Sequence, residues 1–177
     1  MRKMCYTSFR RTAIGLAASV LVLAAAAAAF ILLLGMRPEL LDETRRTGSP
    51  ADLSLEYGYA SYSADGVCDV ALCGNPPVKG KEVYLYLTNP ESNTVWLRAE
   101  IYSVSFTYDA DGAVTAASPD KKLGSSGFIR PGEYVERVTL SEALKDDRTY
   151  VMIKISTYVE STQTSNGFFY VNTALLR

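Results

Sequence analysis

Histidine is absent from all 177 residues of the chain, and its absence removes several classes of chemistry. Without an imidazole base, neither a Ser-His-Asp triad nor a Cys-His pair can form. Metal sites built on imidazole nitrogen are excluded for the same reason. The sequence therefore predicts a protein without a metal and without a cofactor.

Basic residues are sparse beyond the N-terminus, which bears on nucleic-acid binding. Residues 1–12 carry four basic residues and no acid, whereas from residue 51 onward 16 acidic residues outnumber 11 basic ones. A mildly acidic domain repels phosphate backbones, and the sequence has no basic stripe. We expect no nucleic-acid partner.

An apolar run of 23 residues, 13–35, contains no charge. As a helix it would be about 34 Å long, which exceeds the hydrocarbon core of about 30 Å. The sequence therefore predicts one transmembrane helix over residues 13–36. Because four basic residues precede it, the positive-inside rule places residues 1–12 in the cytoplasm and the C-terminal domain outside the membrane.

A cleaved signal peptide is the competing interpretation of this run. Cleavage in the Ala24–Ala29 stretch would leave the apolar sequence FILLLG at the new N-terminus, so we favour an uncleaved signal anchor in the cell membrane. The polar residues 37–50 end in Gly-Ser-Pro and are predicted to form a stalk. The stalk would lead to a single domain at residues 51–177.

Residues 51–177 show the alternation that is typical of β-strands. In the stretch EVYLYLTN, Val83, Leu85 and Leu87 alternate with tyrosine and threonine. Turn sequences such as DADG at 109–112 separate the alternating runs. The other predicted strands cover 94–108, 113–118, 134–140, 149–160 and 167–176. About seven strands over this length predict an all-β chain with an antiparallel β-sandwich.

Tyr150 follows a short crossing, residues 141–147, that is predicted to form a capped helical turn. A tyrosine at the start of a strand after such a crossing is typical of a tyrosine corner, in which the hydroxyl bonds to nearby backbone. We predict a tyrosine corner at Tyr150, and an ordinary strand aromatic is the alternative.

Tyrosine is the most abundant aromatic residue, with 12 in the chain. Tyr57 and Tyr59 would share one strand face, and Tyr84 and Tyr86 would share another. Exposed tyrosine rows can bind glycans or peptides because each ring offers an apolar body and a polar tip. These four residues are the candidate binding surface, and packing within the sandwich is the alternative.

Cys68 and Cys73 lie in the stretch GVCDVALCG. Two thiols without histidine do not complete a metal site, and a redox pair usually has two residues between its cysteines rather than four. Outside the cytoplasm a disulfide is permitted, but it requires the segment to bend. In a straight strand the two Cα atoms would be about 16 Å apart, against about 4.4–6.8 Å in a disulfide. We favour a bridged loop, and we expect separate thiols if the segment is a strand.

Three stretches of the chain together resemble a group of small single-pass proteins of Gram-positive bacteria. These stretches are TNPESN at 88–93, FIRPGEYVERVTLSEAL at 128–144 and TYVMIKISTYVESTQTSNG at 149–167. The resemblance implies one immunoglobulin-like sandwich outside the membrane and an N-terminal anchor. It implies no activity, because the shared motifs are turn sequences. The chain departs from the group by inserting DKKLGSSG before its Pro-Gly turn.

The favoured function is non-enzymatic: a membrane-anchored cell-envelope protein whose sandwich binds or scaffolds an envelope protein or a glycan. A type I signal peptidase has a similar layout, but Gly35 stands where its serine nucleophile should be. An accessory subunit of a membrane or secretion complex is one alternative, since Gly15 and Ser19 permit close helix packing. A hydrolase of envelope polymer is another, and it requires two carboxylates about 5–9.5 Å apart in one cleft.

Overall fold

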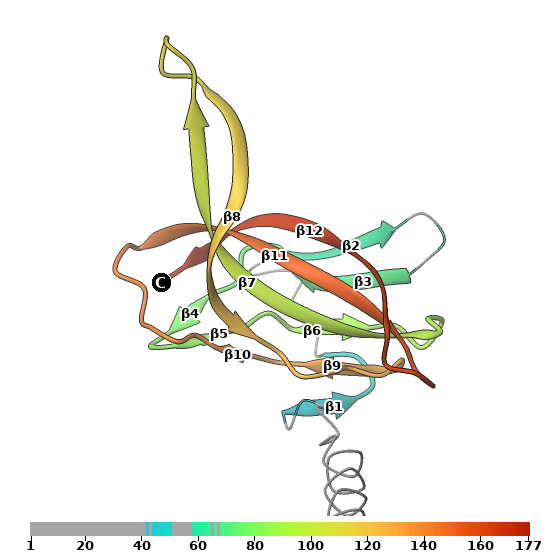
Figure 1. Ribbon diagram of the computed structural model, residues 1–177. Helices are drawn as coiled ribbons and strands as arrows, with labels where there is room; N and C mark the ends of the chain where they lie inside the picture. Colours follow the sequence, from blue (N-terminus) through green and yellow to red (C-terminus); the bar gives the residue numbers. More distant parts are fainter. Residues whose placement is uncertain (1–41, 43, 51–57, 65, 67) are drawn as a thin grey trace, which may run out of the picture. The chain divides into compact units, whose positions relative to one another are not determined.

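We describe the chain from a computed structural model, which covers residues 42, 44–50, 58–64, 66 and 68–177. All of these residues belong to one compact unit, Leu41–Arg177. The predicted tail and transmembrane helix lie outside the described residues. Every regular element among the described residues is a β-strand (Figure 1), and this part of the chain contains no helix that is long and apolar enough to span a membrane.

The strands of the described residues build three sheets, and all strand pairs within them are antiparallel. The four-stranded sheet has the order β12-β11-β7-β8, the five-stranded sheet β1-β9-β6-β3-β2, and the three-stranded sheet β10-β5-β4. The predicted all-β class with antiparallel sheets is therefore confirmed. The strands are β1 (Arg45–Thr47), β2 (Tyr59–Ala64), β3 (Cys68–Cys73), β4 (Val78–Lys79), β5 (Glu82–Val83), β6 (Leu87–Asn89), β7 (Val95–Tyr108), β8 (Val114–Ser125), β9 (Glu133–Val135), β10 (Val138–Thr139), β11 (Arg148–Val159) and β12 (Ser165–Leu176).

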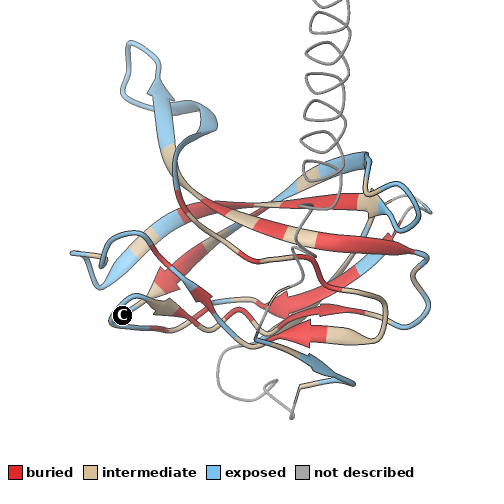
Figure 2. Ribbon diagram, turned by 60° about the horizontal axis from the view of Figure 1, so that its bottom comes forward, coloured by how far each residue is buried: buried red, intermediate tan, exposed pale blue. Residues whose placement is uncertain are grey.

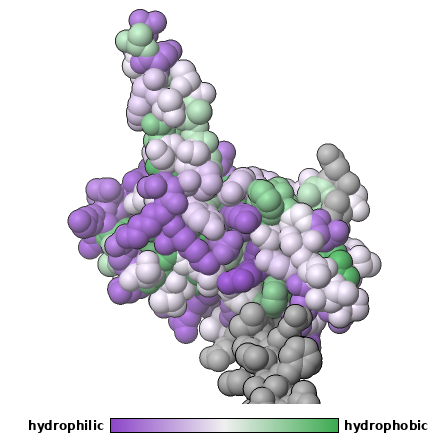
Figure 3. Space-filling view, in the orientation of Figure 1, coloured by the Kyte–Doolittle hydropathy of each residue, from purple (hydrophilic) through white to green (hydrophobic). Residues whose placement is uncertain are grey.

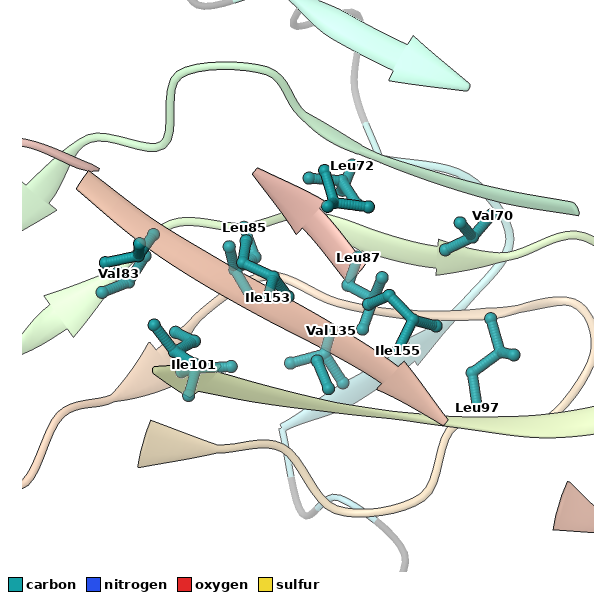
Figure 4. Close-up of a cluster of buried hydrophobic side chains, with 14 of the residues drawn as sticks. Val70, Leu72, Val83, Leu85, Leu87, Leu97, Ile101, Val135, Ile153 and Ile155 are labelled. Atoms are coloured by element: carbon teal, nitrogen blue, oxygen red, sulfur yellow. The ribbon is translucent and has the colours of Figure 1, made fainter. Parts of the chain in front are cut away.

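One hydrophobic core joins the four-stranded sheet to the two other sheets. Val83, Leu85 and Leu87 are buried in it, as their alternation predicted. Ile153 and Ile155 enter the same core from β11 (Figure 4). Buried residues lie along the middle of the strands, and exposed residues lie at the strand ends, in the loops and in the extended hairpin (Figure 2). Each fully buried aliphatic side chain stabilises the fold by about 1.5–3 kcal/mol.

The strand predicted at 82–89 is interrupted at Tyr86. This residue has a φ of 48°, a conformation that favours glycine, and it is the last of the three residues, 84–86, that separate β5 from β6. The carbonyl of Leu85 accepts a hydrogen bond from the backbone N–H of Cys73 at 2.8 Å, so the break remains tied to β3. The alternation of buried residues therefore continues across the break.

Part of the predicted stalk belongs to the β domain. Residues Arg45–Thr47 form β1, which pairs with β9. Arg45 lies 3.4 Å from a carboxylate oxygen of Glu133, and Arg46 lies 3.0 Å from one of Glu136. Residues 45–47 of the predicted stalk are therefore part of a sheet, because Arg45 and Arg46 find acidic partners on the domain. A short, charged strand of this kind is well suited to a sheet edge.

The strands β7 and β8 continue past the rest of their sheet as a hairpin. β11 pairs with β7 only as far as Ser103, whereas β8 stays paired with β7 out to Tyr108. We call residues 104–119 the arm, and it rises clear of the other strands (Figures 1 and 3). β8 is longer than the predicted 113–118, because most of the DKKLGSSG insertion forms its second half.

The second half of β8 approaches the three-stranded sheet at Gly124. Gly124 forms a bridge with Leu140, and the N–H of Ser141 donates to the carbonyl of Leu123 at 2.7 Å. A Cβ atom on Gly124 would lie 2.8 Å from the backbone oxygen of Thr139. The absence of a side chain therefore lets the two sheets meet along this side of the core.

Candidate binding surface

The side of the four-stranded sheet that faces away from the core carries exposed aromatic side chains. Along β7 and β11, odd-numbered residues such as Ile101 and Ile153 enter the core, and the even-numbered residues point outward. We call this outward side the outer face. All large hydrophobic side chains that are exposed in the described part of the chain belong to this one sheet. They are Phe106, Tyr108, Val114, Tyr150, Val159, Phe168 and Tyr170.

At the arm end of the outer face, three rings and a guanidinium group form a continuous surface. The rings of Phe106 and Tyr150 meet edge to face with centroids 6.5 Å apart, and Tyr108 lies 6.5 Å beyond Phe106. The guanidinium of Arg148 covers the ring of Tyr150 at 5.2 Å. Aromatic pairs of this kind contribute about 0.5–1.5 kcal/mol beyond their burial. The contacts hold the rings in place without removing them from solvent.

At the opposite end, Phe168 and Tyr170 form a second aromatic pair. Their centroids are 5.6 Å apart at an interplanar angle of 77°, and the ammonium of Lys154 lies 4.5 Å from the centre of the Phe168 ring. Phe168 is 58% exposed, so this ring keeps more than half of its surface in water. An exposed ring beside a cation is well suited to contact with a partner.

Glu100 lies between the two aromatic ends and holds the charges of the outer face together. Its carboxylate is 2.6 Å from the ammonium of Lys122 and 3.8 Å from that of Lys154. Partial burial raises the pKa of Glu100, but the hydrogen bond and charge of Lys122, with the charges of Arg98 and Lys154, outweigh it and hold the pKa below its ordinary value. The carboxylate is therefore an ion-pair partner and is poorly suited to act as a general acid.

A hollow of about 380 Å³ lies where the arm meets β11 and β12. Its apolar lining comes from the arm and from the outward side chains of the sheet, while an arginine and two asparagines supply polar groups. The side chains that define it are Val104, Phe106, Tyr150, Met152, Arg148, Asn75 and Asn172. An apolar site with a few convergent polar groups has the composition of a binding site.

The tyrosines predicted as the binding surface do not lie on the outer face. Tyr57 is outside the described residues. The Tyr59 hydroxyl shares a hydrogen bond with the hydroxyl of Thr88 on the five-stranded sheet, and its pKa is raised by burial, an effect that the hydrogen bond partly offsets. Tyr84 and Tyr86 lie together, with ring centroids 6.3 Å apart, and both are partly buried.

Tyr150 does not form the predicted tyrosine corner. Its side chain is 55% exposed and contacts Phe106 and Arg148 on the outer face, and its hydroxyl makes no hydrogen bond with a described residue. That crossing, residues 141–147, contains no helical turn either. The strand position was correct, but the residue sits on the outward side of β11.

Cys68 and Cys73, both within the described part of the chain, are not joined by a disulfide. The segment is the strand β3, with Cys68 in the main core and Cys73 buried on the opposite side of the sheet. The predicted bridged loop is therefore wrong, and the alternative of a strand with separate thiols is correct. An extended strand holds the two Cα atoms too far apart for a bridge.

We expect Cys68 and Cys73 to react with maleimide only after unfolding. Burial raises the pKa of both thiols, with the charge of Asp69 adding to the effect at Cys68 and a backbone hydrogen bond from Asn75 opposing it at Cys73. Mass spectrometry of the full chain, labelled in native and denaturing buffer without reductant, measures this. A bridge would instead leave both thiols unlabelled in denaturant until reductant is added.

The turn motifs of the sequence have structural roles in the domain. The amide of Asn89 donates to the carbonyls of Val95 and Ile129, both at 2.9 Å, and its oxygen accepts a hydrogen bond from Asn93. The N–H of Gly132 donates to the carbonyl of Asn89. The Asn-Pro turn and the Pro-Gly turn therefore meet around one buried asparagine.

The most exposed aromatic pair, Phe168 and Tyr170, was not among the candidate residues. It lies in a stretch predicted as a strand, 167–176, so alternation placed both rings on one side. The sequence did not show which side of this strand faces the core, because both the odd-numbered and the even-numbered positions carry apolar residues. Val171 and Leu175 occupy the inward positions.

We compared the chain with protein-family models, curated proteins and solved structures, and none of them matches it significantly.

Proposed function

We propose that the protein is a non-enzymatic cell-envelope module that binds a partner through the outer face. One observation carries this proposal: the exposed large hydrophobic side chains of the described residues all belong to one sheet. Scattered single exposed apolar residues are ordinary, whereas their concentration on one sheet is typical of an interaction surface.

We further propose that the domain is an immunoglobulin-like sandwich. The order β8-β7-β11-β12 corresponds to strands C′, C, F and G of that fold, and β3-β6-β9 corresponds to A, B and E. β1 then takes the place of strand D. The G-F-C sheet is also the one whose outer face carries the exposed rings.

The proposed location is the outer side of a cell membrane, with residues 13–36 as a signal anchor. The basic residues before this run and its length of 23 uncharged positions support an N-terminus in the cytoplasm.

The alternative of a carboxylate-based hydrolase has less support. A general acid needs a raised pKa, whereas ion pairs lower the pKa of Glu100. Asp109 accepts hydrogen bonds from two backbone N–H groups of its own turn, so its carboxylate has a structural role there. The second alternative, an accessory subunit of a membrane complex, would be one form of the partner binding proposed here.

Photocrosslinking in native cells tests the proposal. The full chain carries a photoreactive phenylalanine analogue at position 168, and a control carries it at the exposed Ser61 on β2. We expect an adduct at position 168 that is absent at position 61, either a discrete protein band or material retained on the cell wall. Equal products at both positions, or none at position 168, would contradict a binding role for the outer face.

A further inference from the structure

The arm is a two-stranded ribbon that lacks a third strand. Beyond Ser103, β7 has no pairing with β11, and within the described residues β8 borders only β7 along the arm. Residues 105–122 are all exposed. An isolated two-stranded hairpin is marginally stable in water, and unpaired strand edges favour association with another chain. The arm therefore has the properties of a segment that is completed by a partner.

The arm carries an apolar, acidic tip. Tyr108 and Val114 pair across the strands, and both are more than half exposed. Residues 103–120 contain three aspartates and no basic residue. Asp109 accepts hydrogen bonds from the N–H groups of Asp111 and Ala113, so its carboxylate shapes the turn. Asp111 is exposed, and its carboxylate makes no hydrogen bond or ion pair with another described residue.

The base of the arm carries the complementary features. The hollow of about 380 Å³ is lined there by Phe106, Tyr150 and Met152, with Arg148 at its edge. Arg148 stacks on Tyr150 and forms no ion pair with the described residues. An apolar hollow beside an available guanidinium fits an apolar side chain followed by a carboxylate.

We infer that the partner at this end of the outer face is a second copy of the chain. Two arms related by a two-fold axis run antiparallel, so the tip of each arm reaches the hollow at the base of the other. Tyr108 and Val114 then occupy the hollow, and Asp111 faces Arg148. A two-fold contact must be self-complementary, and the arm and its base supply an acidic apolar tip and a basic apolar hollow on one molecule.

This inference rests on the proposed function, since it names a partner for part of the outer face. The inference and the proposed function can be tested separately, because position 168 lies about six residues along the strands from Tyr150, or about 20 Å. A monomeric chain that still gives the specific adduct at position 168 would overturn the second copy and leave the proposed function intact.

Exchanging the charges at positions 111 and 148 tests the inference. Sedimentation equilibrium of the full chain, purified in detergent, measures the dissociation constant of the dimer. The wild type is expected to dimerise. Asp111→Arg and Arg148→Asp should each weaken dimerisation about tenfold or more, because each variant places like charges together. The double variant should recover to within about threefold of the wild type. Glu160→Lys, an exposed change in the β11–β12 loop, is the control and should leave the dissociation constant unchanged.

Three results would overturn the inference. A monomeric wild type would do so, and the arm would then belong to a different partner. A dimer that is insensitive to both single changes would be held together by another surface, such as the predicted transmembrane helix. Single variants that weaken the dimer without recovery in the double variant would show that Asp111 and Arg148 do not face each other.

Discussion

Asn89→Ala is expected to lower the free energy of unfolding by about 3 kcal/mol. The substitution removes the three hydrogen bonds of the fully buried Asn89 side chain, to the carbonyls of Val95 and Ile129 and from the amide of Asn93. A hydrogen bond of this kind contributes about 0.5–1.5 kcal/mol, and three are lost here, although the Ile129 carbonyl keeps the N–H of Leu97 as a donor. Urea titration of the full chain in detergent, followed by the fluorescence of its single tryptophan, Trp96, measures the change.

Glu91→Ala is the matched control for Asn89→Ala. Glu91 lies in the same turn but is exposed, so its replacement should change stability by less than about 0.5 kcal/mol. If Asn89→Ala lowers the free energy of unfolding no more than Glu91→Ala does, the assigned role of Asn89 is contradicted. It would also remove the structural explanation of the Asn-Pro-x-x-Asn motif.

Gly124→Val is expected to destabilise the fold by about 3 kcal/mol, and Gly124→Ala by about 2 kcal/mol. A Cβ atom would lie 2.8 Å from the backbone oxygen of Thr139, so β8 and β10 must separate to accommodate it. Overpacking of this kind costs about 1–3 kcal/mol because the displaced atoms belong to backbone rather than to a flexible side chain. The same urea titration measures both variants.

Ser118→Val, on the arm, is the control for Gly124→Val. It adds a side chain of the same kind to the same strand at an exposed position, where no close contact is created. We expect it to change stability by less than about 0.5 kcal/mol. Equal losses at positions 118 and 124 would mean that the bulk of valine in β8, and not the approach to Thr139, causes the effect.

The local alternation of the sequence predicted β7, β11 and β12 closely, but it did not predict β1, β2 or β4. Val83, Leu85 and Leu87 are buried as predicted, although Tyr86 breaks their strand in two. Cys68 and Cys73 illustrate a limit of the same reasoning. The distance argument was correct, but spacing alone did not decide between strand and loop, since pairing with Tyr59 and Ala64 on β2 fixes the extended form.

Features that depend on long-range pairing could not be predicted from the sequence. Arg46 was assigned to a stalk because its partner Glu136 lies 90 positions later in the chain. Tyr150 was assigned to a corner because its outward direction depends on the register with β7 and β12. The outer face could be recognised only from the strand register, which places Phe106, Tyr150 and Phe168 on one sheet.

The exposed aromatic face outside the membrane is the central claim, and cysteine labelling at position 168 in native cells tests it most directly. The Phe168→Cys variant is treated with a membrane-impermeant maleimide in intact cells and as purified full chain, with the wild type as control for its buried thiols. We predict that position 168 is labelled in intact cells, but more slowly than in the purified chain, because a partner covers it. Labelling that occurs only after lysis, or equally fast in both preparations, would contradict the account.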